Sequence, residues 1–581
     1  MDIKKTFALA VLNHQKKNIQ VAQDLYKKIL KIDLNHIDAH NNLGVIFQGL
    51  GESLKAKECF EKAITINPNF ANAHNNLGAA LKELDESLKA KKCFEKAITI
   101  NPNYPEAYLN LGIIFVDLKE NQKAKECLEK TIVIDPNNIV AHNNLGIIFK
   151  ELREHQKAKE CFKKAIKTNP NFIDAHNNLG IIFKELEDYH KAIECFEKAI
   201  TIDPNFANAH NNLGIIFQNL GEHQKAKECF EKAITIDPNL VEAQKNISLA
   251  YIRELNDFEK AISSSYKSLK MEKDEFKFIN QSISLFRLKH DVQQAKYLIA
   301  KNYKIDGVDQ FQKVGDKILG RKENNEGKNN YDKKILLTSD EINALLPFYK
   351  SDFTYKPKTI LGSCINPNKN WQDVEDEYFN SSNQIMYIDD FLSDEALIEL
   401  REFCLVSKVW NKEYYNPFLG AYSESGFISP MHLQIAIELQ QKLPKLFGPH
   451  KLGQFWGFKY DSTLGKGINI HADFALHNLN FWITPDEYNN NKNGGGLKVY
   501  DAPAPDHWTF QDYNARPDKI YKFLKENDAK CTNIPHKYNR AVLFNSAYFH
   551  ETDEIDFKDE YEGRRINNTY LFGNRLVEQI K

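Results

Sequence analysis

The sequence predicts a multidomain protein in which an all-α solenoid of repeated units precedes a β-rich domain with flanking helices. A block of six residues, Ala-His-Asn-Asn-Leu-Gly, recurs at steps of 34 residues or multiples of 34 in the first half of the chain. Between about residues 306 and 334 this period lapses, and beyond it short β-prone runs replace the repeats and all five tryptophans follow. The 581 residues therefore hold two architectures, fewer than the roughly four domains that length alone suggests.

The repeated block is followed in each unit by a fixed set of small and aromatic residues. The block begins at Ala39, Ala73, Ala141, Ala175 and Ala209, with a variant at Ala107, and one unit continues with Ala56, Phe60, Ala63 and Pro68. This pattern resembles the tetratricopeptide repeat, which implies a helix–turn–helix in each unit and a superhelical solenoid overall. Close repeats cover residues 37–240, and degenerate units extend the expected array to residues 1–304.

The repeat also accounts for most of the cysteines and several histidines. Six of the nine cysteines copy one repeat position: Cys59, Cys93, Cys127, Cys161, Cys195 and Cys229. The remaining three, Cys364, Cys404 and Cys531, have no paired metal-ligand spacing. Histidines recur in the same way at His40, His74, His142, His176 and His210. We expect partly buried thiols and structural histidines, not disulfides or ligands.

One polar position of the repeat has a possible binding role. Asparagine occupies it at Asn42, Asn76, Asn110, Asn144, Asn178, Asn212 and Asn246. A row of amides, each with donors and an acceptor, can pair with an extended peptide backbone without reading its sequence. The row resembles the asparagine ladder of O-GlcNAc transferase, which implies peptide binding. The alternative is that these amides cap or pack locally.

Net charge and apolar runs exclude two classes of partner. The 77 Lys and Arg residues nearly balance the 79 Asp and Glu residues, whereas broad nucleic-acid binding requires a basic excess. No run approaches the roughly 20 apolar residues that span a bilayer. The first 18 residues predict an amphipathic helix, not a signal peptide. We therefore expect a cytoplasmic protein without nucleic-acid or membrane partners.

Residues 305–380 are predicted to connect the array to the β-rich domain at 381–581. The polar stretch that begins at Arg321 predicts a loop. Beyond it, β-prone runs occur at 455–460, 479–484, 497–500, 541–544 and 566–572.

A candidate metal site lies within these runs. His471 and Asp473 are two residues apart at the end of a β-prone run, so on a strand they would share one face. The apolar run 541–550 leads to His550 as a third ligand. Two histidines and one carboxylate on one face are typical of non-haem Fe(II) oxygenases. His477 and His536 are alternatives to His550.

Two further features accompany the ligands. Three glycines at 494–496 precede a β-prone run between the ligand positions, and Arg565 opens another run in which Asn567 would share its face. With them, residues 381–581 resemble the Fe(II)/2-oxoglutarate dioxygenase superfamily, particularly its prolyl 4-hydroxylase-like branch. The resemblance implies a double-stranded β-helix, or jelly roll, with the metal inside.

The resemblance also assigns residues to roles. It implies that His471, Asp473 and His550 hold iron, that Arg565 binds the far carboxylate of 2-oxoglutarate, and that Tyr460 and Asn567 contact the co-substrate. Arg565 follows His550 by 15 residues, a longer gap than usual, so Arg564 competes for the role.

The expected reaction uses Fe(II), 2-oxoglutarate and O₂, with ascorbate as a reductant, to hydroxylate a C–H bond and release succinate and CO₂. Because both domains share one chain, we expect the array to capture a protein or peptide whose side chain is hydroxylated. Two alternatives stay open: an interaction scaffold with an inactive oxygenase domain, and a small-molecule hydroxylase whose array assembles partners. Zinc also suits two histidines and a carboxylate.

Overall fold

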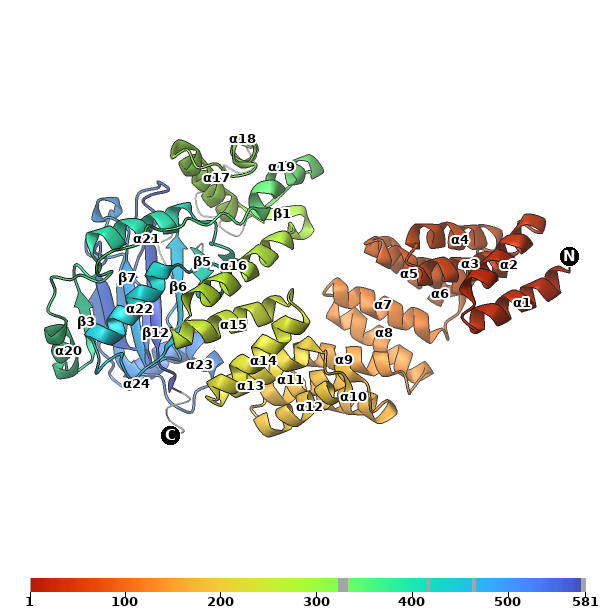
Figure 1. Cartoon of the computed structure of the whole chain (residues 1–581), viewed down its shortest axis with the longest axis horizontal. Coiled ribbons are helices and arrows are strands. Elements are labelled where there is room, and N and C mark those ends of the chain that lie inside the picture. The colour runs from red at the N-terminus through yellow and green to blue at the C-terminus, as the bar shows by residue number, and fades with distance from the viewer. Residues whose placement is uncertain (1, 256, 322–332, 415–417, 462–466, 576–581) are drawn as a thin grey trace. The chain divides into compact units, whose positions relative to one another are not determined.

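The computed structural model describes residues 2–255, 257–321, 333–414, 418–461 and 467–575 (Figure 1). The chain forms two compact units, residues 1–213 and 214–581. The predicted loop from Arg321 to Asn330 lies outside the described residues except for Arg321 itself. Within the described residues, every helix is too short or too polar to cross a bilayer.

The first unit is an all-α solenoid of helix pairs, and its last helix continues into the second unit. Its helices are α1 (Ile3–Gln15), α2 (Ile19–Ile32), α3 (Ile37–Gly49), α4 (Ser53–Ile66), α5 (Ala71–Glu83), α6 (Ser87–Ile100), α7 (Pro105–Asp117), α8 (Asn121–Ile134), α9 (Ile139–Glu151), α10 (His155–Thr168), α11 (Ile173–Glu185), α12 (Tyr189–Ile202) and α13 (Ala207–Asn219). The period of 34 residues thus corresponds to one helix–turn–helix, as the sequence predicts.

The repeated glycine lets the two helices of a pair approach closely. A Cβ on Gly44 of α3 would lie 2.6 Å from the ring of Phe60 on α4, too close for any larger residue without repacking. Phe60 is fully buried. The same glycine and aromatic recur in most repeats, so one contact sets the helix spacing along the array.

The repeated cysteines and histidines have structural roles. All nine cysteines are free, and burial raises the pKa of repeat thiols such as Cys59 to about 11. The Nε2 atom of each repeated histidine lies 2.9–3.1 Å from the carbonyl oxygen six residues earlier, for example His142 and Pro136. These histidines therefore stabilise the turn that precedes their own helix, in agreement with the structural role predicted from the sequence.

The second unit begins with helices that continue the repeats and then pack on the β-rich region. Its helices are α14 (His223–Ile236), α15 (Val241–Glu254), α16 (Phe258–Asp274), α17 (Leu285–Ala300), α18 (Val308–Leu319), α19 (Ser339–Lys350), α20 (Trp371–Asn380), α21 (Asp394–Val406), α22 (Pro430–Lys442), α23 (Phe510–Asn514) and α24 (Pro517–Glu526). A short pair, β1 (Ser282–Ser284) and β2 (Lys334–Leu336), joins the connecting segment to this unit. The predicted connector 305–380 therefore contains three helices, α18 to α20.

Helix α16 is fixed to the β-rich region by hydrogen bonds. Ser265 Oγ donates to the Ser423 carbonyl at 2.6 Å, and Tyr266 OH donates to the Ile428 carbonyl at 2.8 Å. The boundary of the second unit consequently falls within the repeats, because α15 and α16 share a hydrophobic core with the strands that follow.

The strands form two antiparallel sheets. The larger has the order β3 (Ile385–Ile388), β10 (Ala541–Asn545), β7 (His477–Trp482), β12 (Ile566–Phe572), β6 (Leu452–Tyr460), β5 (Phe418–Tyr422) and β4 (Lys412–Glu413). The smaller has the order β11 (Tyr548–Thr552), β8 (Leu497–Pro503) and β9 (Cys531–Ile534). All five β-prone runs of the sequence are strands. The β-rich region is thus a pair of antiparallel sheets of seven and three strands.

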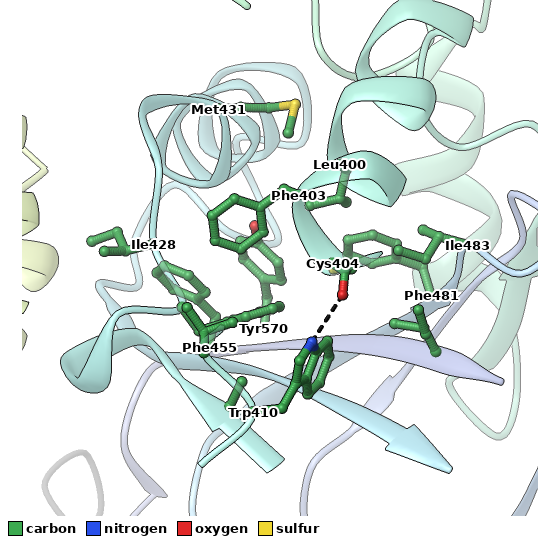
Figure 2. Close-up of a cluster of buried hydrophobic side chains, with 14 of the residues drawn as sticks. Leu400, Phe403, Cys404, Trp410, Ile428, Met431, Phe455, Phe481, Ile483 and Tyr570 are labelled. Carbon is green, nitrogen blue, oxygen red and sulfur yellow. Dashed lines mark hydrogen bonds between the residues drawn. The ribbon is translucent and has the colours of Figure 1, made fainter. Parts of the chain in front are cut away.

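Helices α21 and α22 cover one face of the large sheet (Figure 2). Phe403 of α21 and Met431 of α22 lie over Phe455 of β6 and Tyr570 of β12, all buried. Trp410 closes this core, and its indole Nε1 donates to the Cys404 carbonyl at 2.8 Å. Because side chains alternate along a strand, the neighbouring residues of β6, β7 and β12 face the opposite side.

Candidate metal centre

The three predicted ligands meet although none of them follows the expected local path. His471 is not in a regular strand; it forms an isolated antiparallel bridge with His550. The run 541–550 is not one strand, because the chain leaves β10 of the large sheet, turns, and enters β11 of the small sheet. Asn545 Oδ1 accepts the Ala547 N–H at 3.0 Å and stabilises this turn.

Backbone hydrogen bonds hold the ligand segments together. The His471 N–H donates to the His550 carbonyl at 3.0 Å, and the His550 N–H donates back at 2.8 Å. The Asp473 N–H donates to the Ser546 carbonyl at 3.0 Å. Ligand atoms of His471, Asp473 and His550 lie within 4.8 Å of one another, the one such group among the described residues.

The imidazoles are oriented with Nε2 toward the carboxylate. The Nδ1 atom of His471 lies 2.9 Å from the Asn469 carbonyl, and that of His550 lies 3.0 Å from the Tyr548 carbonyl. Donation from Nδ1–H leaves the Nε2 lone pair free, the arrangement usual for metal-bound histidine. The Nε2 atoms lie 4.0 Å and 3.5 Å from the Asp473 oxygens.

Electrostatics favour a neutral imidazole at the deepest ligand. Burial and then the neighbouring His471 lower the pKa of His550 well below its ordinary value. Burial raises the pKa of Asp473, whereas His471 and a hydrogen bond from Asn478 oppose that rise. A divalent cation would stabilise the carboxylate in this buried position, so two neutral nitrogens and one oxygen fit a metal such as Fe(II) or Zn²⁺.

Three buried asparagines link the carboxylate to Arg565. Asn478 donates its amide to Asp473 Oδ2 at 2.6 Å, and its oxygen accepts from Asn480 at 2.7 Å. Asn480 in turn accepts from Asn567 at 3.1 Å, and Arg565 donates to Asn567 Oδ1 at 3.4 Å. We call Asn478, Asn480 and Asn567 the amide relay. Every amide points its donor toward Asp473, so the relay fixes the carboxylate in one orientation.

Arg565 lines the same cavity as the ligands. The cavity has a volume of about 30 Å³. Arg565 is 2% exposed, and Nε and Nη2 donate to the carbonyls of Gly495 and Gly496. Its guanidinium carbon lies 4.7 Å from the centre of the Tyr460 ring. Among the described residues it forms no ion pair, so this cation has no carboxylate partner of its own.

Arg564 faces the opposite direction. Its Nη2 donates to Gln293 Oε1 on α17 at 2.7 Å, and its Nη1 lies 3.4 Å from Asp461 Oδ2. The geometry thus brings Arg565, and not Arg564, to the predicted ligands, because the two successive residues that precede β12 point in opposite directions.

The alternative histidines lie elsewhere. His477 packs edge-on against Tyr378 and Phe447. His536 packs against Trp482, and its Nδ1 lies 3.5 Å from Asp486 Oδ1. Neither belongs to the cluster of metal-ligating groups.

Two residues of the amide relay were missed from the sequence: Asn478, which donates to Asp473, and Asn480, which donates to Asn478. Their signal was present, since both occupy the face of β7 opposite to the apolar Leu479 and Phe481. When polar and apolar residues alternate along a fully buried strand, the polar side chains face a polar cavity and not solvent.

A larger cleft opens in front of the ligands. Its volume is about 520 Å³, and it shares Trp456, His471 and Asp473 with the inner cavity. Its other walls are mostly aromatic, including Tyr414, Phe418 and Tyr422. We call it the metal cleft. The indole Nε1 of Trp456 is buried there without a hydrogen-bond partner among the described residues.

The repeated asparagines form hydrogen bonds between adjacent repeats. The side-chain amide of Asn76 donates to Asn41, and that of Asn178 to Asn143, at 3.0 and 3.1 Å. Asn110 and Asn212 do the same with the preceding repeat. Asn144 instead bonds to its own helix, because the preceding repeat has Leu109 at the acceptor position. A local packing role therefore exists, and peptide binding stays a prediction.

Comparison with known families identifies the repeats. A tetratricopeptide-repeat model matches residues 37–70, 71–104, 139–172, 173–206 and 207–240, and a second tetratricopeptide-repeat model matches residues 93–126. Residues 37–240 therefore contain a tetratricopeptide-repeat array, a class of solenoid that serves as a scaffold for protein–protein interaction.

Solved structures are similar to this chain over about a third of its length. MamA is 28% identical, with 28% of this chain and 95% of MamA covered and a TM-score of 0.26. YrrB, a tetratricopeptide-repeat protein with an unusual peptide-binding site, is 22% identical over 32% of this chain and 95% of its own, with a TM-score of 0.28. PilF of Pseudomonas aeruginosa is 20% identical over 36% and 95%, with a TM-score of 0.33. Curated proteins provide no match to the sequence.

Proposed function

We propose that residues 381–581 form an Fe(II)- and 2-oxoglutarate-dependent dioxygenase built on a double-stranded β-helix. The observation that carries the proposal is the cavity that Arg565 shares with His471, Asp473 and His550. A metal alone needs no buried guanidinium beside it, whereas the far carboxylate of a metal-bound dicarboxylate does. The two antiparallel sheets, whose inner faces both line this cavity, support the β-helix.

The chain's own residues would bind and orient the reactants. When bound, Fe(II) with 2-oxoglutarate, O₂ and ascorbate as reductant would hydroxylate a C–H bond and yield succinate and CO₂. His471, His550 and Asp473 would hold the metal, and the relay would keep the carboxylate oriented. Arg565 has five N–H donors; Gly495, Gly496 and Asn567 accept three of them and the Tyr460 side chain interacts with the same guanidinium, so a donor is left for a carboxylate. The Tyr460 ring beside the guanidinium would exclude water from that contact.

The proposed substrate is a side chain of a protein or peptide. The metal cleft, at about 520 Å³, is large enough for a side chain, and its aromatic walls offer apolar contact. The tetratricopeptide array would capture the same polypeptide. Each ladder amide that bonds to the preceding repeat uses one N–H, so a second N–H is available for a peptide carbonyl.

Succinate release tests the proposal. The wild-type chain, supplied with Fe(II), 2-oxoglutarate and O₂, should release succinate, and His471→Ala should reduce the rate at least about 100-fold because a first ligand is lost. His507→Ala is a matched control, since His507 is exposed and outside the cluster. Equal rates in wild type and His471→Ala would disprove the assigned ligands. Absence of Fe(II) binding by the wild type would favour an interaction scaffold instead.

A further inference from the structure

A second hollow adjoins the metal cleft. It consists of two lobes with volumes of about 490 and 520 Å³, which share Phe276, Arg287, Asn411 and Tyr414. The second lobe shares Tyr414 and Tyr422 with the metal cleft. We call the two lobes the basic cleft. It runs from the end of α16 toward the candidate metal ligands, within the second unit.

The basic cleft carries an excess of positive charge. Its cationic residues are Lys245, Lys273, Lys277, Arg287, Lys334 and Lys412. Three carboxylates, Glu272, Glu413 and Glu424, line the same cleft, and Glu272 is already paired with Lys245 at 2.5 Å. Glu424 accepts a hydrogen bond from the Gln454 amide at 3.0 Å, and burial raises its pKa. A formally cationic cleft in a chain of net charge −2 is a local feature, not a consequence of composition.

The deepest cations lack a full set of counter-charges. Lys273 is 5% exposed and forms no ion pair among the described residues. Lys408 is also 5% exposed, and its Nζ lies 3.6 Å from the centre of the Phe348 ring and has no hydrogen-bond partner among the described residues. Arg287 pairs with Asp291 at 2.5 Å. Two buried lysines and the partly buried Arg287 thus lie together, and Asp291 forms an ion pair with Arg287 alone among the three.

This charge imbalance has an energetic consequence. Burial and then the Arg287 charge lower the pKa of Lys273 to about 7. Burial and the Lys273 charge lower the pKa of Lys408. Burial disfavours the charged form of Lys273, so an anion that enters beside Lys273 and Arg287 would stabilise the protonated ammonium.

We propose that the basic cleft binds an acidic segment of the polypeptide whose uncharged side chain enters the metal cleft. The part of this proposal that places a side chain in the metal cleft rests on the proposed oxygenase function. Among the described residues, those that line the metal cleft include no Lys, Arg or Glu and no Asp other than Asp473, so the cleft suits an uncharged side chain. The two lobes continue from it and are rimmed by exposed lysines such as Lys412, so they suit several acidic residues in sequence. A free inorganic anion would fill only one position.

The test uses fluorescence anisotropy with the full-length chain and two labelled peptides, (Glu-Gly)₆ and (Gln-Gly)₆. The acidic peptide should bind at least about ten-fold more tightly. Lys273→Met and Lys412→Glu should each weaken its binding about three- to ten-fold. Lys270→Met and Lys267→Glu are matched controls, because both lysines are exposed on α16 and outside the cleft. Lys412 is exposed, so its variant keeps the test valid if Lys273→Met fails to fold.

Three results would overturn the proposal. The first is equal affinity for the two peptides, and the second is unchanged affinity for the acidic peptide in both cleft variants. The third is displacement of the acidic peptide by inorganic phosphate when phosphate supplies the same total negative charge as the peptide. The same contrasts should appear in the His471→Ala background, where no succinate is expected. Peptide selectivity without succinate release by wild type would therefore refute the oxygenase and leave the acidic-segment site intact.

Discussion

Replacing Asn478 by leucine tests the amide relay. Asn478 is fully buried on β7, donates to Asp473 Oδ2 at 2.6 Å and accepts from Asn480 at 2.7 Å. Leucine has the same branched shape and the same number of side-chain heavy atoms but is larger and forms neither bond. The carboxylate then loses a donor, and the Asn480 amide loses its acceptor inside a closed cavity.

The magnitude follows from these two losses. A hydrogen bond to a charged group contributes about 1.5–3 kcal/mol, and an unpaired buried N–H costs about 1–3 kcal/mol. The added apolar surface of leucine offsets about 1 kcal/mol. We expect the free energy of unfolding of the metal-free protein to fall by about 2–5 kcal/mol. Metal affinity should fall about 10–100-fold, as it does when partners of metal ligands are removed.

Asn568→Leu is the matched control. Asn568 is also fully buried, on β12, but it faces the helix-covered side of the sheet, and neither side-chain polar atom has a hydrogen-bond partner among the described residues. Its replacement should leave stability unchanged or raise it by about 1–3 kcal/mol, with unchanged metal affinity.

Urea unfolding followed by tryptophan fluorescence reports on this region alone, because all five tryptophans follow residue 370. Co²⁺ titration gives the metal affinity. Equal destabilisation by Asn478→Leu and Asn568→Leu, or full metal affinity in Asn478→Leu, would refute the positioning role of the relay.

Three further predictions concern the co-substrate, the repeat and pH. Arg565→Lys should raise the KM for 2-oxoglutarate about 10–100-fold in the succinate assay with unchanged metal affinity, whereas Arg564→Lys should lower stability and leave that KM unchanged. Gly44→Ala should lower the free energy of unfolding of the repeats, followed by circular dichroism, by about 1–3 kcal/mol, because the new Cβ would lie 2.6 Å from an aromatic ring. Gly49→Ala is the control: it has open space around it and should raise that free energy by about 0.5–1 kcal/mol. Burial lowers the pKa of His432 from 6.5 to about 3 in the folded chain. Between these values the unfolded chain binds a proton that the folded chain does not, so the free energy of unfolding falls as pH falls from 6.5 toward 3. His432→Phe should flatten that slope in urea unfolding by up to about 1.4 kcal/mol per pH unit.

The repeat array could be predicted almost completely from the sequence. Copies of one unit report the same local environment several times, so Gly44 and Phe60 identify a helix contact that a single unit would leave ambiguous. The degenerate end was harder to assign. The sequence shows where the pattern weakens near residue 243, but only packing shows that α15 and α16 join the β-rich region.

The candidate ligands could also be predicted, but not the path that brings them together. His471 and Asp473 were expected on a strand, and the structure has an isolated bridge instead. The run to His550 was expected to be continuous, and it crosses between sheets. The identity of the ligands depends on side-chain chemistry, which the sequence displays. The passage of residues 541–550 from one sheet to the other depends on which strands are available to pair with each half of that segment.

The sequence by itself determined the 34-residue helical unit, the five β-prone runs and the three metal-ligating residue types, because periodicity and side-chain chemistry are local properties. Only the tertiary structure decided that Arg565 and not Arg564 faces the ligands, that three asparagines connect it to Asp473, and that unpaired cations line a cleft beside them. These features depend on strand faces, burial and the neighbours of each charge, and residues distant in sequence acquire them only when the two sheets and the final helices pack together.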